Sequence, residues 1–131
     1  MANTERYDIK TLDEALKIIT NPELERVYKK FLSDFSKDNS FTGVYTSKKE
    51  IEDSIKERVT DGLNEKFTEL KSRISRLRRK GCDVNLTDLK LTSFQFKINF
   101  LDADFDLSTY NKLKNILDEI GKMIEPFKDI D

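Results

Sequence analysis

The sequence predicts an all-α fold, a helical bundle built around one long helix at about residues 48–80. Apolar residues recur every three or four positions over most of the chain, which is the period of an amphipathic helix. The main runs open at residues that can cap a helix. With 131 residues, nine of them Phe, the chain has enough apolar side chains to fold and fits a single domain, 1–131.

Two short helices are expected first. The capping box Thr11-Leu-Asp-Glu14 predicts the start of one, and Asn21-Pro22-Glu23 predicts the start of a second that runs to about Phe35. The second helix has a single stripe to bury, made of Leu24, Val27, Tyr28, Phe31, Leu32 and Phe35. The turn formers and large apolar residues of 36–46 predict a loop that packs against the fold.

The long helix is bounded by clear signals. Ser47 and Glu50 form a capping box at its start, and Gly81 suits the left-handed conformation that ends a helix. Such a helix is about 50 Å long and needs a partner along its length, from this chain or from another copy. The spacing of its second half alternates between four and three, as in a coiled coil, which predicts a contact seam of Leu63, Phe67, Leu70, Ile74 and Leu77.

The segment 84–105 is compatible with two structures. Phe94, Phe96, Ile98 and Phe100 alternate with polar residues, which favours α+β with a short strand or hairpin within 84–101. A buried helix is the other possibility, with one face of Leu91, Phe94, Ile98, Leu101 and Phe105 and an adjoining face of Leu86, Leu89, Phe96 and Phe100. A final helix is clearer: Asp106 or Ser108 caps it, Pro126 stops it, and its apolar face is Tyr110, Leu113, Ile116, Leu117, Ile120 and Ile124.

Part of this segment resembles a group of known proteins. The run Gly81-Cys-Asp-Val84, followed by Leu86, Leu89-Lys-Leu91, Phe94 and Lys97-Ile98, resembles a segment of small, uncharacterised, lysine- and glutamate-rich helical proteins of archaea. The resemblance covers about residues 70–124. It implies an all-α fold and an archaeal source, and it carries over no activity and no site residues. Prolines common in that group near residues 94–96 are missing here.

Composition argues against most enzyme classes. The chain has no His, so it lacks the usual general base, and its four Gly are not spaced as in a phosphate-binding loop. The single Cys82 excludes an intrachain disulfide. Asp102, Asp104 and Asp106 begin like a calcium loop, but Leu stands where that loop needs Gly and Glu. We therefore expect no enzyme, no cofactor and no metal site, with carboxylate catalysis as the least favoured alternative.

The distribution of charge along the chain is the remaining indication of function. Residues 71–80, here called the basic tract, carry six cations and no acid, whereas residues 101–131 carry eight acids and four Lys. Two antiparallel copies, or one chain folded back, would bring these signs together. We expect a cytoplasmic, non-enzymatic interaction or assembly module, most simply a homodimer that self-associates through the long helix, with no membrane segment. The alternative is a small nucleic-acid or ribonucleoprotein binder that uses Arg73, Arg76, Arg78, Arg79 and Lys80.

Overall fold

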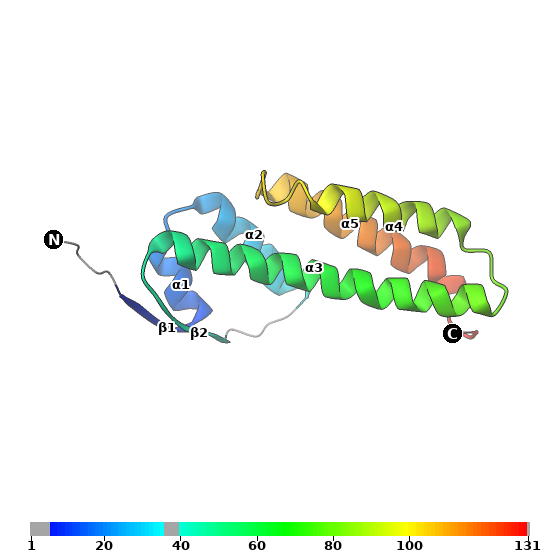
Figure 1. The fold of residues 1–131 in the computed structure, drawn as a ribbon, viewed down its shortest axis with the longest axis horizontal. Coiled ribbons are helices and arrows are strands. Elements are labelled where there is room, and N and C mark those ends of the chain that lie inside the picture. Colours follow the sequence, from blue (N-terminus) through cyan, green and yellow to red (C-terminus); the bar gives the residue numbers. More distant parts are fainter. Residues whose placement is uncertain (1–5, 36–39, 131) are drawn as a thin grey trace. The chain divides into compact units, whose positions relative to one another are not determined.

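The computed structural model describes residues 6–35 and 40–130. Its described part is mostly helical, with five α-helices and two short strands (Figure 1), so the predicted helical fold built around one long helix is confirmed. The chain divides into two compact units, Met1–Val59 and Thr60–Asp131, called the N-terminal and C-terminal units below. The long helix α3 (Lys48–Arg79) is continuous through this division, and the expectation of a single domain stays a prediction.

The N-terminal unit contains a small sheet that the sequence did not reveal. Strand β1 (Tyr7–Thr11) pairs antiparallel with β2 (Ser40–Tyr45), with Tyr7 opposite Tyr45 and Ile9 opposite Gly43. The predicted loop at 36–46 is wrong for residues 40–45, which form β2, and 36–39 lie outside the described residues. Aromatic and β-branched side chains in Ser-Phe-Thr-Gly-Val-Tyr suit a strand, and the residues that it pairs with lie 29 to 38 positions earlier in the chain.

Both predicted helices of this unit begin at their predicted caps. Helix α1 (Leu12–Ile18) starts after Thr11, whose Oγ1 accepts a 3.3 Å hydrogen bond from the Glu14 N–H. Helix α2 (Pro22–Asp34) starts after Asn21, whose Oδ1 accepts a 3.2 Å hydrogen bond from the Leu24 N–H. Its predicted stripe is largely buried: Leu24, Val27, Tyr28 and Phe31 are buried, and Leu32 and Phe35 are half-buried.

Helix α3 has the bounds that its cap residues predict. The Ser47 Oγ accepts a 3.1 Å hydrogen bond from the Glu50 N–H, and the Glu50 carboxylate accepts a 2.6 Å bond from the Thr46 N–H. At the other end Gly81 has φ 89°, and the Gly81 and Cys82 N–H groups bond to the carbonyls of Arg78 and Leu77. This is the Schellman arrangement, which satisfies the last free carbonyls of the helix.

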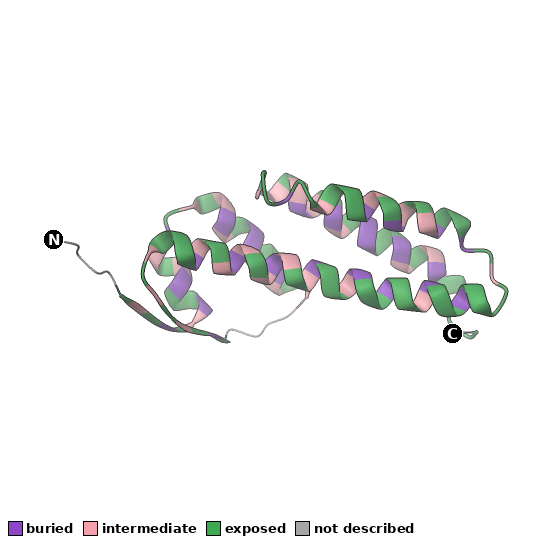
Figure 2. Cartoon of the chain, viewed as in Figure 1, coloured by how far each residue is buried: buried purple, intermediate pink, exposed green. Residues whose placement is uncertain are grey.

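In the C-terminal unit, the second half of α3 packs with α4 (Asn85–Ile98) and α5 (Leu107–Ile124). A short 3₁₀ turn (Glu125–Phe127) follows α5. Segment 85–98 is helical, so the alternative of a strand or hairpin within 84–101 is wrong. The predicted face of α5 is buried throughout, and Figure 2 shows buried positions recurring along the inner sides of the helices. None of the helices in the described ranges is long and apolar enough to cross a membrane.

Candidate interaction surface on α4

Helix α4 is anchored in the C-terminal unit by its inner face. Phe94 is fully buried, and its ring stacks on that of Phe67 from α3 at a centroid distance of 4.9 Å and an angle of 14° between the rings. Leu91 and Thr87 are buried beside it. Asp88 forms an ion pair with Arg78 of α3. These contacts fix which side of α4 faces the core.

The opposite face of α4 is also apolar, and it is exposed. Leu86, Leu89, Phe96 and Phe100 have exposed fractions of 70%, 67%, 66% and 50%. Leu86, Leu89 and Phe96 lie on α4 and, with the half-buried Ser93, fall within about 80° on a helical wheel. Phe100 lies in the turn directly after the helix and continues the alternating spacings of three and four. We call these five positions the outer stripe. Among the described residues, only Val44 and Ile130 are other large apolar side chains with comparable exposure.

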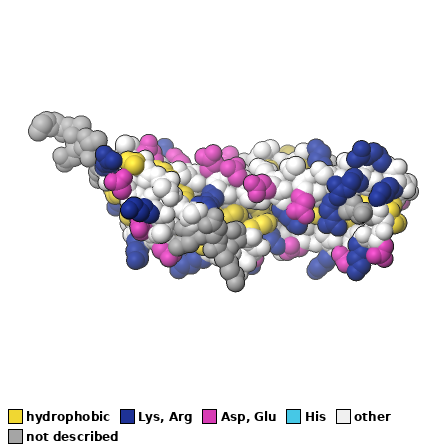
Figure 3. All heavy atoms as spheres, turned by 90° about the horizontal axis from the view of Figure 1, so that it is seen from below, with side chains coloured by type: hydrophobic (Ala, Val, Ile, Leu, Met, Phe, Trp, Pro, Cys, Tyr) yellow, Lys and Arg dark blue, Asp and Glu magenta, His cyan; other side chains and the backbone are white. Residues whose placement is uncertain are grey.

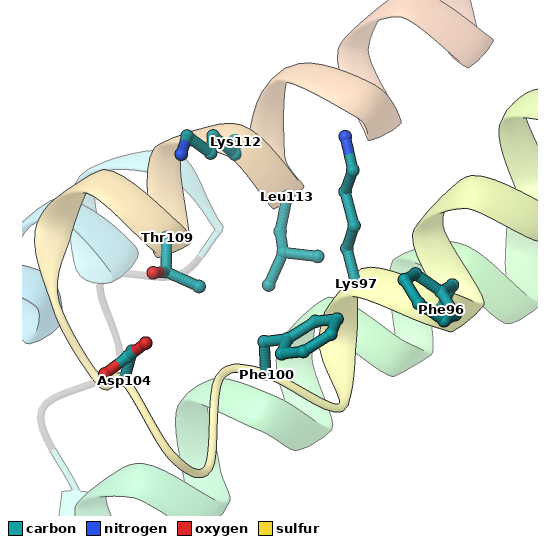
Figure 4. A pocket seen from close by; sticks show the side chains of 7 residues that line it. All are labelled: Phe96, Lys97, Phe100, Asp104, Thr109, Lys112 and Leu113. Carbon is teal, nitrogen blue, oxygen red and sulfur yellow. The ribbon is translucent and has the colours of Figure 1, made fainter.

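The C-terminal end of the outer stripe opens into a hollow. Its volume is about 400 Å³, and it lies between the end of α4 and the start of α5. Phe96 and Phe100 form one side; Leu113 projects from α5 toward the Phe100 ring, and Lys97 reaches from α4 toward α5 (Figure 4). The remaining lining residues are Asp104, Thr109 and Lys112. The lining thus combines apolar surface with two cations and one anion.

The two edges of the outer stripe differ in charge. One edge carries Lys90 and Lys97, seven positions apart, and is called the lysine edge. Lys90 is bound to Glu119 of α5 at 2.6 Å, whereas Lys97 makes no ion pair with any residue that the structure describes. The other edge is uncharged and consists of Asn85, Thr92 and Asn99. The surface is therefore apolar along its centre and cationic on one side.

The predicted seam of α3 lies inside the protein. Its five side chains have exposed fractions of 0–8%: Leu63, Phe67, Leu70, Ile74 and Leu77. Phe67, for example, is covered by Phe94 of the same chain. The partner that a 32-residue helix requires is thus at least partly supplied by α4, and the seam is not on the surface of the single chain.

The basic tract lies at the end of the C-terminal unit where α3 ends and α4 begins, and Figure 3 shows Lys and Arg side chains gathered there. Each candidate phosphate ligand already has a partner within the chain. Arg78 is paired with Asp88, Lys80 donates to the Ile130 carbonyl, and the Arg79 Nε donates to the Ser75 carbonyl at 3.4 Å. Arg73 and Arg76 also have interaction partners.

The acidic cluster has a structural role at one of its members. Asp106 caps α5 by accepting a 2.7 Å hydrogen bond from the Thr109 N–H. Hydrogen bonds from the backbone and side chain of Thr109 hold the pKa of Asp106 below its usual range. Within the described ranges, no group of three or more Cys, Asp or Glu side chains could hold a metal ion.

The apolar face of Leu86, Leu89, Phe96 and Phe100 was part of the buried-helix alternative for segment 84–105; the helix is present, but this face of it is exposed. The signal that could have shown its exposure is that α4 has two apolar faces, while the three-helix unit needs only one of them. Comparison of the chain with protein-family models, curated proteins and solved structures finds no match.

Proposed function

We propose that this protein is a non-enzymatic protein-interaction module, and that it binds a helical segment of a protein partner along the outer stripe of α4. One observation carries this proposal. Leu86, Leu89 and Phe96 on α4, and Phe100 in the turn after it, are exposed in a row, while the other face of α4 is held in the core. Contiguous exposed apolar surface on a small protein typically marks an interaction site. A helix with apolar side chains at alternating spacings of three and four suits a helical partner.

The docking surface therefore differs from the one that the sequence suggested. Binding through the α3 seam would require Leu70 and its neighbours to leave the interior, where they are 0–8% exposed. Exposing a buried Leu or Phe costs about 1.5–3 kcal/mol per side chain. The outer stripe needs no such opening, so a partner gains the burial energy without first disrupting the fold.

A titration with a helical probe tests this function. The probe is a synthetic neutral peptide with Leu along one helical face and Ala and Gln elsewhere, added to ¹⁵N-labelled protein. We expect the amide signals of residues 86–100 to shift. The double variant Leu89→Gln with Phe96→Gln should bind at least about tenfold more weakly, because each lost apolar side chain removes about 1.5–3 kcal/mol of burial and 1.4 kcal/mol corresponds to tenfold.

The matched control is Val44→Gln, which removes a similarly exposed apolar side chain from β2. It should leave the affinity unchanged. Absence of shifts in residues 86–100, or an equal loss of affinity with Val44→Gln, would overturn the proposal.

Nucleic-acid binding through the basic tract is the second candidate, favoured by the concentration of Lys and Arg at one end of the C-terminal unit. The internal partners of Arg78, Arg79 and Lys80 weaken it, since phosphate would have to displace them. A mixed RNA and DNA ligand that shifts residues 71–80 at low salt, with affinity falling steeply as salt rises, would favour this function instead.

A further inference from the structure

We infer that the segment bound on the outer stripe is an amphipathic helix with acidic residues along one edge of its apolar face, and that it places a large apolar side chain in the hollow between α4 and α5. This inference rests on the proposed function and specifies its partner. It is carried by the unequal edges of the stripe and by the hollow at its end.

The lysine edge selects the charge of the partner. Lys90 is neutralised by Glu119 at 2.6 Å, so Lys97 is the cation on that edge that is open to an external acid. Lys112 stands across the hollow from it on α5. The hollow also contains Asp104, which leaves one net positive charge in its lining. An acidic edge on the partner gives Lys97 a counter-ion, whereas a basic edge faces repulsion.

The same edges argue against a second copy of this chain as the occupant. In a two-fold antiparallel pair each edge meets its own equivalent, so the two lysine edges would face each other, and the acid beside them, Glu119, is already paired with Lys90. In a parallel two-fold pair the lysine edge would meet Asn85, Thr92 and Asn99, which are uncharged. Neither arrangement provides an acid from the stripe's edges, so a partner of different sequence is the better fit.

The hollow adds an anchoring point. It is continuous with the stripe because Phe96 and Phe100 belong to both. The exposed rings of Phe96 and Phe100 offer apolar contact above the buried Leu113, and the volume of about 400 Å³ accommodates a large side chain. Binding energy in such interfaces concentrates in one or two apolar anchors set in pockets. A Leu or Phe of the partner helix placed here lies next to Lys97, which receives the acidic edge (Figure 4).

The test compares two synthetic peptides that share one apolar face and differ only at its edges, one carrying Glu and the other Lys. Affinities are measured by fluorescence anisotropy at low and high salt, and binding sites by amide shifts. We expect the Glu peptide to bind about tenfold more tightly at low salt, because each exposed ion pair is worth up to about fivefold and the two lysines that line the hollow, Lys97 and Lys112, contribute. The preference should shrink at high salt.

Three variants make the test specific. Lys97→Glu should remove the preference for the Glu peptide, and Lys97→Arg should retain it, because Arg keeps the charge. Lys17→Glu changes the net charge of the protein as Lys97→Glu does, but at an exposed site on α1 in the N-terminal unit. It should leave the preference unchanged.

The outcomes separate the two proposals. Equal binding of both peptides at residues 86–100, or tighter binding of the Lys peptide, overturns the acidic partner and leaves the docking function in place. A dimer that Phe96→Gln abolishes, and that competes with the peptides, also overturns the acidic partner by showing a second copy on the stripe. If neither peptide shifts residues 86–100, the proposed function itself fails.

Discussion

Replacing Phe94 and Phe96 by alanine in turn tests the orientation of α4, on which the interaction surface depends. Phe94 is fully buried and stacked on Phe67 at a centroid distance of 4.9 Å, whereas Phe96 is 66% exposed and its ring meets that of Phe100 edge-on at a centroid distance of 5.4 Å. Truncation of a buried Phe costs about 3–5 kcal/mol, the sum of lost burial and the cavity left behind. Phe96→Ala removes no core contact and should cost less than about 1 kcal/mol.

Urea unfolding followed by helical circular dichroism measures both changes as shifts of the midpoint. A loss of about 3–5 kcal/mol is a large part of the roughly 5–15 kcal/mol that stabilises a domain, and it could prevent Phe94→Ala from folding. In that case Phe94→Leu, with an expected cost of about 1–2 kcal/mol, replaces it in the comparison with Phe96→Ala. Equal destabilisation by the Phe94 and Phe96 replacements would refute the reasoning, because a strand would place both rings on one face while the helix separates them.

Three further predictions concern other parts of the chain. Asn21→Ala should lower the free energy of unfolding by about 1 kcal/mol through loss of the α2 cap, whereas Asn21→Asp keeps a capping oxygen and should be neutral; calorimetry measures both. Leu70→Ala should cost about 2–5 kcal/mol, and this cost should not change with protein concentration, since Leu70 is buried within the single chain. Asp106 has a lowered pKa in the fold, so its cap contributes stability above the unfolded pKa and loses it as pH falls through the folded pKa. Asp106→Asn keeps the cap without a titrating group and should reduce the loss of stability in acid, as measured by urea midpoints against pH.

Each of these has a clear contrary result. Equal costs for Asn21→Ala and Asn21→Asp would remove capping as the cause. A Leu70→Ala cost that grows on dilution would show that copies of the chain share the α3 seam. Unchanged acid sensitivity in Asp106→Asn would show that other carboxylates dominate the loss of stability at low pH.

The caps and helix ends followed from the sequence because their chemistry is local. Thr11, Asn21, Ser47 and Asp106 bond to backbone N–H groups three residues later, so a short window contains all the information. The sheet did not follow, because paired residues of β1 and β2 are 29 to 38 positions apart and the five and six residues of the two strands give a weak pattern. The sequence therefore predicted the helix caps, which depend on neighbouring residues, but not the pairing of the two strands, which are far apart in the chain.

The α3 seam shows a second kind of limit. Spacings of four and three predict that another helix packs against this apolar side of α3. All five residues of the predicted seam are buried, as such packing requires: Leu63, Phe67, Leu70, Ile74 and Leu77. The spacing does not encode whether the partner belongs to the same chain. The choice is made by the turn at Gly81, with φ 89°, which sends the chain back so that Phe94 reaches Phe67. A local glycine thus decides what covers part of the long helix.

The ambiguity of segment 84–101 and the proposed function have the same physical origin. A helix with one buried face shows one apolar stripe, but this segment has Phe94 and Ile98 on the inner side and Phe96 and Phe100 on the outer stripe. Each pair is spaced by four positions and the two pairs are offset by two, so apolar residues recur at every second position from 94 to 100. This mixture imitates a strand in the sequence. In the fold it leaves one face of α4 without a partner from the described chain, because α3 and α5 contact the inner side. An apolar pattern that exceeds what the fold can bury is therefore itself evidence for an external partner, and α4 is where this chain has that excess.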